Sequence, residues 1–171
     1  YSVADYTELI YGFVDQLGIA NASLVGHSLG AIIALQVAKQ EPDLISRLAT
    51  VSLPVTPQSI NSHLRDFSSS SVRAKVFWWR HIPHKEVQTE TEKVAENAIA
   101  LSVESALKVD TEALVDQGTQ PTLVIYGEND SVIDPEPVHV LNGRRPNLRP
   151  IGLAASKHFP MLEEANKFNR L

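Results

Sequence analysis

A serine stands at the turn between an apolar run and a helix-forming run, in the sequence Gly-His-Ser-Leu-Gly at residues 26–30. A strand that reverses into a helix within one residue brings the backbone before the corner against the backbone after it. Residues without a side chain are therefore expected two positions before and two after the corner, at Gly26 and Gly30. The corner residue is then strained, at the positive end of a helix. We expect Ser28 to be exposed there and able to attack a carbonyl carbon; a tight turn with glycines for packing is the alternative.

Serine becomes a nucleophile when a base removes its proton, and imidazole held by a carboxylate is the base suited to neutral pH. Asp130 and His158 each follow an apolar run that predicts a strand, as Ser28 does. Because the carboxyl ends of parallel strands meet at one edge of a sheet, the three side chains are expected to lie together there. Asp134 and Glu128 are alternatives for the acid, and a core or surface position is the alternative for His158.

Three other side chains are candidates for binding substrate. Trp78 and Trp79 are large aromatics suited to line an acyl pocket, although ordinary packing is the commoner role of such residues. His27 is expected to contact substrate or to pack beside the corner.

Two histidines have a spacing that a metal site can use. His81 and His84 are three residues apart, which would place both on one side of a helix. Pro83 lies between them and disfavours a helix, and no cysteine or acidic cluster joins them. We therefore predict no metal site.

The apolar spacing predicts the elements that position these residues. Ser2 is expected to cap a helix that ends at Gly18 and buries a stripe formed by Tyr6, Leu9, Ile10, Phe13, Val14 and Leu17. Strands are predicted over residues 22–26, 48–53, 121–126 and 148–154, and further helices over 29–40 and 161–171. This order predicts an α/β fold, with a parallel sheet and flanking helices.

Residues from 54 to 120 show no strand pattern. They contain polar turns, a serine run at 68–71 and a Glu- and Ala-rich stretch over residues 91–107 that predicts a helix. We interpret this region as a helical lid inserted in a single domain that covers residues 1–171.

The composition of the 171 residues is typical of one globular domain. The net charge is -5, with basic residues scattered among the acidic ones, which argues against a nucleic-acid surface or a polybasic membrane patch. No apolar run approaches the roughly 20 residues that span a bilayer. Cysteine is absent, which is typical of a reducing compartment, and we predict a cytoplasmic location.

Three segments together resemble the α/β-hydrolase superfamily, in particular its lid-bearing esterases and lipases. They read Val-Gly-His-Ser-Leu-Gly at 25–30, Pro-Thr-Leu-Val-Ile-Tyr-Gly-Glu-Asn-Asp at 121–130 and His-Phe-Pro-Met-Leu-Glu at 158–163. The resemblance covers nearly the whole chain. The family pattern of Gly, two residues, Asp and then Pro favours Asp130 as the acid, with Asp134 as the reserve.

The resemblance implies a serine hydrolase that cleaves a carboxylic ester or a related small acyl substrate. In such an enzyme Ser28 attacks, His158 relays the proton, Asp130 orients His158, and the Leu29 N–H helps to hold the oxyanion. No cofactor is implied. Serine at the corner disfavours dehalogenase and epoxide hydrolase chemistry, whereas thioesters, lactones, carbon–carbon bonds and cofactor-free perhydrolysis remain alternatives.

The resemblance also implies further strands before the first helix and a His-Gly-type loop that gives a second oxyanion N–H. We find no such segment upstream of Ser28, so we expect the C-terminal portion of a larger enzyme, or a chain completed by another polypeptide or by strand exchange. The first strand is then an unpaired edge, and we predict association through it. A binding module that kept the scaffold without catalysis is the alternative function.

Overall fold

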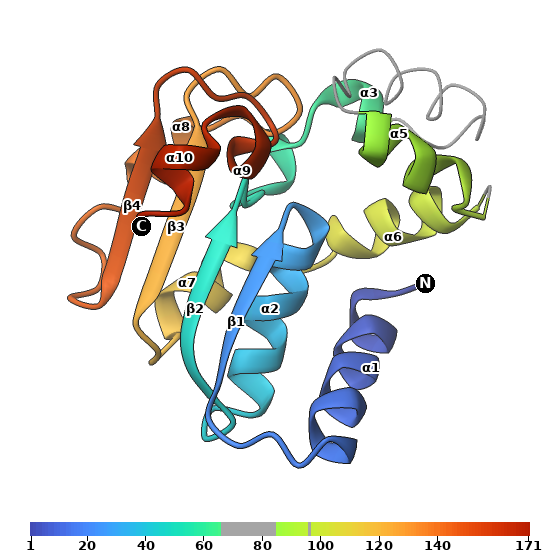
Figure 1. The fold of residues 1–171 in the computed structure, drawn as a ribbon, viewed down its shortest axis with the longest axis vertical. Coiled ribbons are helices and arrows are strands. Elements are labelled where there is room, and N and C mark those ends of the chain that lie inside the picture. The colour runs from blue at the N-terminus through green and yellow to red at the C-terminus, as the bar shows by residue number, and fades with distance from the viewer. Residues whose placement is uncertain (66–84, 96) are drawn as a thin grey trace.

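The computed structural model describes residues 1–65, 85–95 and 97–171, which form a parallel sheet with helices against both faces (Figure 1). The strands are β1 (Ala22–His27), β2 (Ile45–Val51), β3 (Thr122–Gly127) and β4 (Leu148–Leu153). The helices are α1 (Val3–Gln16), α2 (Leu29–Gln40), η1 (Pro57–Ser59), α3 (Ser62–Arg65), α5 (Lys85–Glu92), α6 (Ala98–Ala106), α7 (Thr111–Gln117), α8 (Glu136–His139), α9 (Pro160–Glu163) and α10 (Ala165–Phe168). The predicted α/β fold is confirmed.

The strands are all parallel, in the order β1-β2-β3-β4, and their carboxyl ends are aligned. His27, the last residue of β1, pairs with Val51 of β2, and Gly127 of β3 pairs with Leu153 of β4. The segments that follow the four strands therefore begin at one edge of the sheet. This edge positions the candidate site.

Successive side chains of the central strands point to opposite faces of the sheet. Val124 of β3 joins the core on the face covered by α2 and α7, where it lies in one cluster with Val115. The next residue, Ile125, joins a smaller cluster on the other face, against Met161 of α9 and Phe168 of α10. Figure 1 shows these last two helices in front of the sheet and α2 behind it.

Helix α1 begins as predicted, but it buries a different face. Ser2 accepts the Asp5 N–H and the Asp5 carboxylate accepts the Ser2 N–H, which together make a capping box. The buried residues of this helix are Val3, Thr7 and Val14, so the predicted buried stripe is correct only at Val14. The exposed part of the predicted stripe includes Leu9, Phe13 and Leu17.

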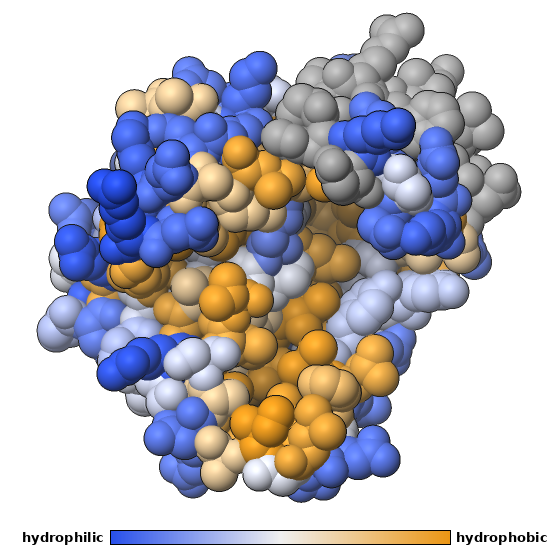
Figure 2. Space-filling model, in the orientation of Figure 1, coloured by the Kyte–Doolittle hydropathy of each residue, from blue (hydrophilic) through white to orange (hydrophobic). Residues whose placement is uncertain are grey.

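The reason is that α1 contacts α2 and α6, and its other side has no covering element in the described chain. Strand β1 is the edge of the described sheet and exposes 64% of Val25. Figure 2 shows apolar surface on the part of the molecule where Figure 1 places β1 and the end of α1. The edge position of β1 is as expected, whereas association through it stays a prediction.

The helix predicted over residues 91–107 is two separate helices, α5 and α6, and α7 was not predicted. Hydrogen bonds to α1 fix α6: Ser105 Oγ accepts the Val3 N–H (2.9 Å), and Ser102 Oγ lies 3.2 Å from the Tyr6 hydroxyl. Such contacts between distant segments leave no periodic signal in the sequence. Helix α7 did have a signal, since Asp110 caps it by accepting the Ala113 N–H.

The remaining boundaries differ for local reasons. Strand β2 lies earlier than predicted, since Ser52 leaves the extended conformation with φ 48°. The helix predicted over 161–171 is two short helices, α9 and α10, with Glu164 between them. The carboxylate of Glu164 accepts the Ala155 N–H and the Ser156 hydroxyl, so this residue holds the preceding loop. No helix among the described residues is long and apolar enough to cross a bilayer.

Candidate active site

Ser28 occupies the sharp corner between β1 and α2. Its backbone has φ 54° and ψ −116°, a conformation that costs a non-glycine residue about 1–3 kcal/mol. Its N–H donates to the Val51 carbonyl (2.8 Å), which ties the corner to the end of β2. Leu29 is the first residue of α2, so its N–H has no acceptor one turn earlier in the helix and is available as an oxyanion donor.

Only one of the two flanking glycines is required for close approach. A Cβ on Gly26 would overlap the Gly30 carbonyl oxygen, because the start of α2 lies directly against β1. A Cβ on Gly30 would meet no described atom within 4 Å. The expectation that both positions must be bare is therefore wrong for Gly30, where a side chain would project into open space.

We expect Gly26→Ala to destabilise the fold by more than about 3 kcal/mol, since the new methyl group overlaps backbone that cannot shift without opening the corner. Gly30→Ala is the matched control, and its effect should stay within about 1 kcal/mol, the helix propensity difference between the two residues. Urea denaturation of both variants measures this difference. Equal losses of stability would contradict this account of the corner.

Asp130 and His158 form a buried pair at the carboxyl ends of β3 and β4. His158 Nδ1 lies 2.8 Å from Asp130 Oδ2, and the two side chains are 3% and 1% exposed. The other oxygen of Asp130 accepts the N–H groups of Val132 (2.8 Å) and Ile133 (2.9 Å). Since a carboxylate only accepts, Nδ1 of His158 carries the proton in this contact, which leaves Nε2 of the neutral ring as the basic nitrogen.

Asp130 is held in its charged form. Burial alone would raise its pKa, but the hydrogen bond and charge of His158 and the two backbone N–H groups outweigh burial and lower the pKa below its usual range. The carboxylate is therefore ionised at neutral pH. It stabilises positive charge on the imidazole.

The other two acidic candidates have different contacts. Asp134 Oδ1 accepts an N–H at the start of α8 (3.0 Å), and Glu128 Oε2 lies 3.3 Å from His139 Nε2. Asp130 is thus the carboxylate that the described structure places beside His158.

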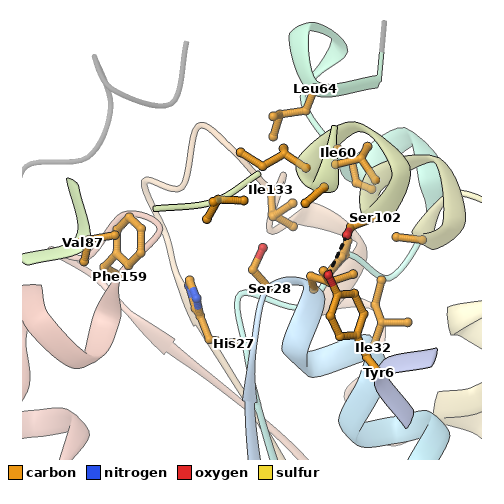
Figure 3. Close-up of a pocket in the computed structure, with 17 residues that line it drawn as sticks. Tyr6, His27, Ser28, Ile32, Ile60, Leu64, Val87, Ser102, Ile133 and Phe159 are labelled. Atoms are coloured by element: carbon orange, nitrogen blue, oxygen red, sulfur yellow. Dashed lines mark hydrogen bonds between the residues drawn. The ribbon is translucent and has the colours of Figure 1, made fainter. Parts of the chain in front are cut away.

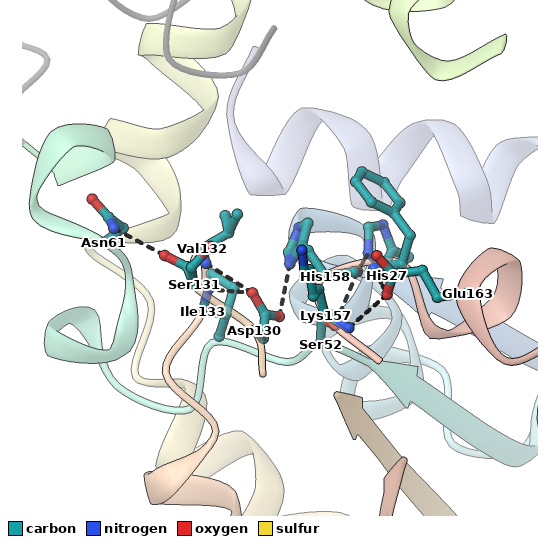
Figure 4. A network of polar contacts seen from close by, with 11 residues as sticks. His27, Ser52, Asn61, Asp130, Ser131, Val132, Ile133, Lys157, His158 and Glu163 are labelled. Atoms are coloured by element: carbon teal, nitrogen blue, oxygen red, sulfur yellow. Dashed lines mark hydrogen bonds and ion pairs between the residues drawn. The ribbon is translucent and has the colours of Figure 1, made fainter. Parts of the chain in front are cut away.

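The loop that carries His158 is fastened at several backbone positions (Figure 4). Ser52, which follows β2, donates its hydroxyl to the His158 carbonyl (3.2 Å). Glu163 Oε2 accepts the N–H groups of Lys157 (2.6 Å) and Phe159 (3.3 Å). Neither Ser52 nor Glu163 was predicted to have a role in the site. The one signal in the sequence for the role of Glu163 was its position four residues after Phe159.

His27 precedes the corner serine in the chain and contacts the candidate base. Its Nε2 is 2.7 Å from the His158 carbonyl oxygen, and its ring centroid is 4.7 Å from that of His158 and 5.1 Å from that of Phe159. Burial lowers the pKa of His27 from 6.5 to about 4, and the neighbouring His158 adds to this effect. His27 is therefore neutral at pH 7.

The lowered pKa of His27 predicts that stability falls in mild acid. Between about pH 4 and 6.5 the unfolded chain binds a proton at His27 that the folded chain does not, so the free energy of unfolding decreases as the pH falls through this window. The expected slope is about 1 kcal/mol per pH unit. Urea denaturation from pH 4.5 to 7.5 measures it. His27→Phe should have a flatter dependence in this window, and an unchanged slope would refute the assignment.

Ser28 and His158 meet at the same edge of the sheet, but no hydrogen bond joins their side chains in the part of the chain that the structure describes. They are linked through His27, which precedes Ser28 and contacts His158. Figure 4 shows His158 between Asp130 and His27. Hydrogen bonds of catalytic groups are often long in ligand-free enzymes and shorten when substrate binds.

The Ser28 hydroxyl points into a cavity of about 480 Å³ (Figure 3). The described residues that line the cavity include no Asp, Glu, Lys or Arg. Most are apolar side chains from α2, α3, α5, α6 and the segments that follow β2, β3, β4 and α5, namely Leu29, Ile32, Pro54, Ile60, Leu64, Val87, Val94, Ala98, Ile99, Val103, Ala106, Ile133 and Phe159. The polar lining residues are Tyr6, His27, Ser28 and Ser102.

Four residues singled out in the sequence, Trp78, Trp79, His81 and His84, lie outside the described residues. Their predicted roles, as pocket lining or as a rejected metal pair, stay predictions. Within the described ranges, no group of three His, Asp or Glu side chains is placed to hold a metal ion.

Comparison with sequence families gives a match over residues 1–83 to a family model described as the alpha/beta hydrolase fold. Among curated proteins, a mouse sn-1-specific diacylglycerol lipase is 29% identical over 97 residues, which are 57% of this chain and 30% of the lipase. A putative carbamate hydrolase of Stutzerimonas stutzeri is 23% identical over 192 positions, covering 100% of this chain and 72% of that protein. The chain thus spans less than a third of the mouse lipase.

Two solved structures are similar over 99% of this chain. A hydrolase from Pseudomonas aeruginosa superposes with a TM-score of 0.82 at 19% identity, and 70% of its chain is covered. An esterase from Exiguobacterium antarcticum gives a TM-score of 0.81 at 19% identity, with 72% covered. These likenesses establish the fold.

Proposed function

Because the chain has the α/β-hydrolase fold and residues 1–83 match the model of that family, we propose that it hydrolyses a neutral carboxylic ester or a related acyl substrate through Ser28, His158 and Asp130. The observation that carries the proposal is the buried contact between Asp130 and His158, 2.8 Å long, at the sheet edge where Ser28 faces a cavity. This contact leaves Nε2 of His158 basic and gives the base a carboxylate partner.

In the proposed mechanism, Ser28 Oγ attacks the acyl carbon while His158 Nε2 accepts its proton. The Leu29 N–H donates to the oxygen that becomes negative, and Asp130 stabilises the imidazolium. His158 then protonates the leaving oxygen, which releases the alcohol and leaves an acyl group on Ser28. Water then attacks the acyl carbon while His158 Nε2 accepts its proton, and His158 gives that proton to Ser28 Oγ as the carboxylic acid leaves.

The cavity supports an uncharged, largely hydrocarbon acyl group as the substrate class. The described lining is apolar apart from a few hydroxyl and imidazole groups, and a charged substrate group would lose its hydration there without an ionic partner from the described lining. Residues 54–120, as the proposed lid, would supply the α5 and α6 part of this lining.

A series of p-nitrophenyl esters tests the proposal. We expect kcat/KM to rise from acetate to hexanoate as the acyl chain fills the cavity. The p-nitrophenyl monoester of succinic acid should react at least about 10²-fold more slowly than butyrate, because its carboxylate must be desolvated. No hydrolysis of any ester above the rate in buffer would favour a binding module on this scaffold. Preference for the succinate ester would contradict the substrate class alone.

A further inference from the structure

We propose that His27 is a positioning residue for the base: its neutral ring donates a hydrogen bond from Nε2 to the backbone carbonyl of His158 and fixes the place from which His158 acts. The inference rests on the proposed function, since it gives His158 the role of the base. His27 also lines the cavity, so the positioning role is additional to the substrate contact expected from the sequence.

The direction of the hydrogen bond follows from its acceptor. The His158 carbonyl oxygen, 2.7 Å away, only accepts, so Nε2 of His27 must carry the proton. The ring is neutral at pH 7, and its proton is therefore on Nε2 and absent from Nδ1. His27 and His158 thus hold opposite tautomers, because Nδ1 of His158 carries its proton toward Asp130.

Residues at the ends of three neighbouring strands hold both the backbone carbonyl and the ring of His158. His27 ends β1 and Ser52 follows β2, and both donate to the His158 carbonyl. Asp130 follows β3 and holds the ring through Nδ1. A peptide carbonyl with two fixed donors cannot rotate freely, so the Cα–Cβ direction of His158 is set before substrate arrives. Misplacement of a catalytic group by about 1 Å can lower the rate about 100-fold.

The ring of His27 also fills space. Its face lies near His158 and Phe159, with centroids 4.7 and 5.1 Å away. Substitutions of His27 can therefore separate the contribution of packing from that of the hydrogen bond. Phenylalanine keeps an aromatic ring and removes the donor, whereas glutamine keeps an N–H near the position of Nε2 and removes the ring.

We expect His27→Phe to lower kcat for p-nitrophenyl butyrate by about 10- to 100-fold with KM changed less than about 3-fold. His27→Gln should recover most of kcat. His139→Phe is the matched control, because that histidine is 37% exposed and contacts Glu128 and Glu136 on the surface, and its kcat should match the wild type. An unchanged kcat in His27→Phe, or an equal loss in both His27 variants, would overturn the proposal.

A second readout does not need turnover. The Nδ1 proton of His158 is shielded from solvent by its contact with Asp130, so its proton NMR signal should be visible in the wild type and in His27→Gln, and exchange-broadened in His27→Phe. A sharp signal in all three proteins would contradict positioning by His27. Loss of the proposed function would be recognised separately, as failure of the wild type to hydrolyse any ester.

A different observation leads to a second proposal: we infer that the hydroxyl pair of Tyr6 and Ser102 binds a neutral hydrogen-bond acceptor, such as a keto or ether oxygen, in the substrate. The two oxygens are 3.2 Å apart, and both residues line the cavity that Ser28 faces. Ser102 is only 4% exposed. Each hydroxyl has one proton and the pair uses one of them, so one O–H donor remains in an otherwise apolar region.

A substrate oxygen that meets this donor would gain a hydrogen bond that a hydrocarbon chain cannot make. We expect one of the 3-, 4- or 5-oxohexanoyl p-nitrophenyl esters to have a kcat/KM at least about 10-fold above hexanoate. Tyr6→Phe and Ser102→Ala should each abolish this preference, so that kcat/KM for the oxo ester falls to the value for hexanoate in the same variant. Equal rates for all four esters, or a preference that survives both substitutions, would refute this subsite.

Ligand binding checks the same subsite without catalysis. The neutral ketone 2-octanone should raise the Tm of the wild-type protein in proportion to ln(1 + [L]/Kd), and the rise should be smaller in Tyr6→Phe. Equal shifts in the two proteins would contradict a hydrogen bond from the pair.

Discussion

Ser28→Ala is expected to lower kcat for ester hydrolysis by about 10⁶-fold, because it removes the only atom that forms the acyl-enzyme in the proposed mechanism. Replacing the hydroxymethyl side chain with a methyl group leaves the backbone conformation of residue 28 and its 2.8 Å N–H hydrogen bond to the Val51 carbonyl unchanged. The fold should therefore remain. Steady-state kinetics with p-nitrophenyl butyrate measures the loss. Circular dichroism checks the fold.

The matched control for this substitution is Ser23→Ala, an exposed serine on β1, the strand that precedes Ser28. It should leave kcat within about twofold of the wild type, as expected for a surface substitution away from the site. A Ser28→Ala protein that is folded and keeps more than about one hundredth of wild-type kcat would rule out Ser28 as the nucleophile.

Asp130→Asn is expected to lower kcat by about 10⁴-fold, and the local hydrogen bonds explain why. One oxygen of Asp130 accepts the N–H groups of Val132 and Ile133, so the amide oxygen of asparagine will take that place. The NH2 group then faces His158 Nδ1 and donates to it. This forces the proton of the imidazole to Nε2, the nitrogen that must accept the serine proton.

Asp134→Asn is the control for this change, since that side chain accepts the Glu136 N–H and was the reserve candidate for the acid. It should alter kcat less than about threefold. The two variants are compared by kcat at pH 7.5 with the same ester. A large loss in Asp134→Asn together with little loss in Asp130→Asn would exchange the two roles.

The sequence was sufficient to predict the parts of the site that depend on local chain geometry. The run Gly-His-Ser-Leu-Gly predicted the corner at Ser28 because a strand that turns directly into a helix needs a bare position where the two touch, and Gly26 is that position. The strands before Asp130 and His158 predicted one shared edge, since parallel strands align their carboxyl ends.

Contacts between distant segments could not be predicted in the same way. The hydroxyl of Ser52 and the carboxylate of Glu163 hold the His158 loop through its backbone, and a contact with backbone does not depend on the residue type of the partner. Hydrogen bonds between α1 and α6 join residues that are 96 to 102 positions apart in the chain. The apolar stripe of α1 was misassigned because periodicity shows that a face is apolar, but not which neighbour covers it.

His27 illustrates the same limit within the motif itself. Its position before Ser28 suggested a contact with substrate or simple packing. Its lowered pKa and its hydrogen bond to the His158 carbonyl depend on a loop 131 residues later in the chain.

Covalent labelling is the most direct test of the central claim, that Ser28 is activated by the Asp130–His158 pair. The protein is treated with a fluorophosphonate, and intact mass and peptide mapping are measured for the wild type, Ser28→Ala and Asp130→Asn. We predict one added phosphonyl group on Ser28 in the wild type, none in Ser28→Ala, and labelling at least about 10²-fold slower in Asp130→Asn. A wild-type protein that remains unlabelled, or is labelled at another residue, would contradict the claim.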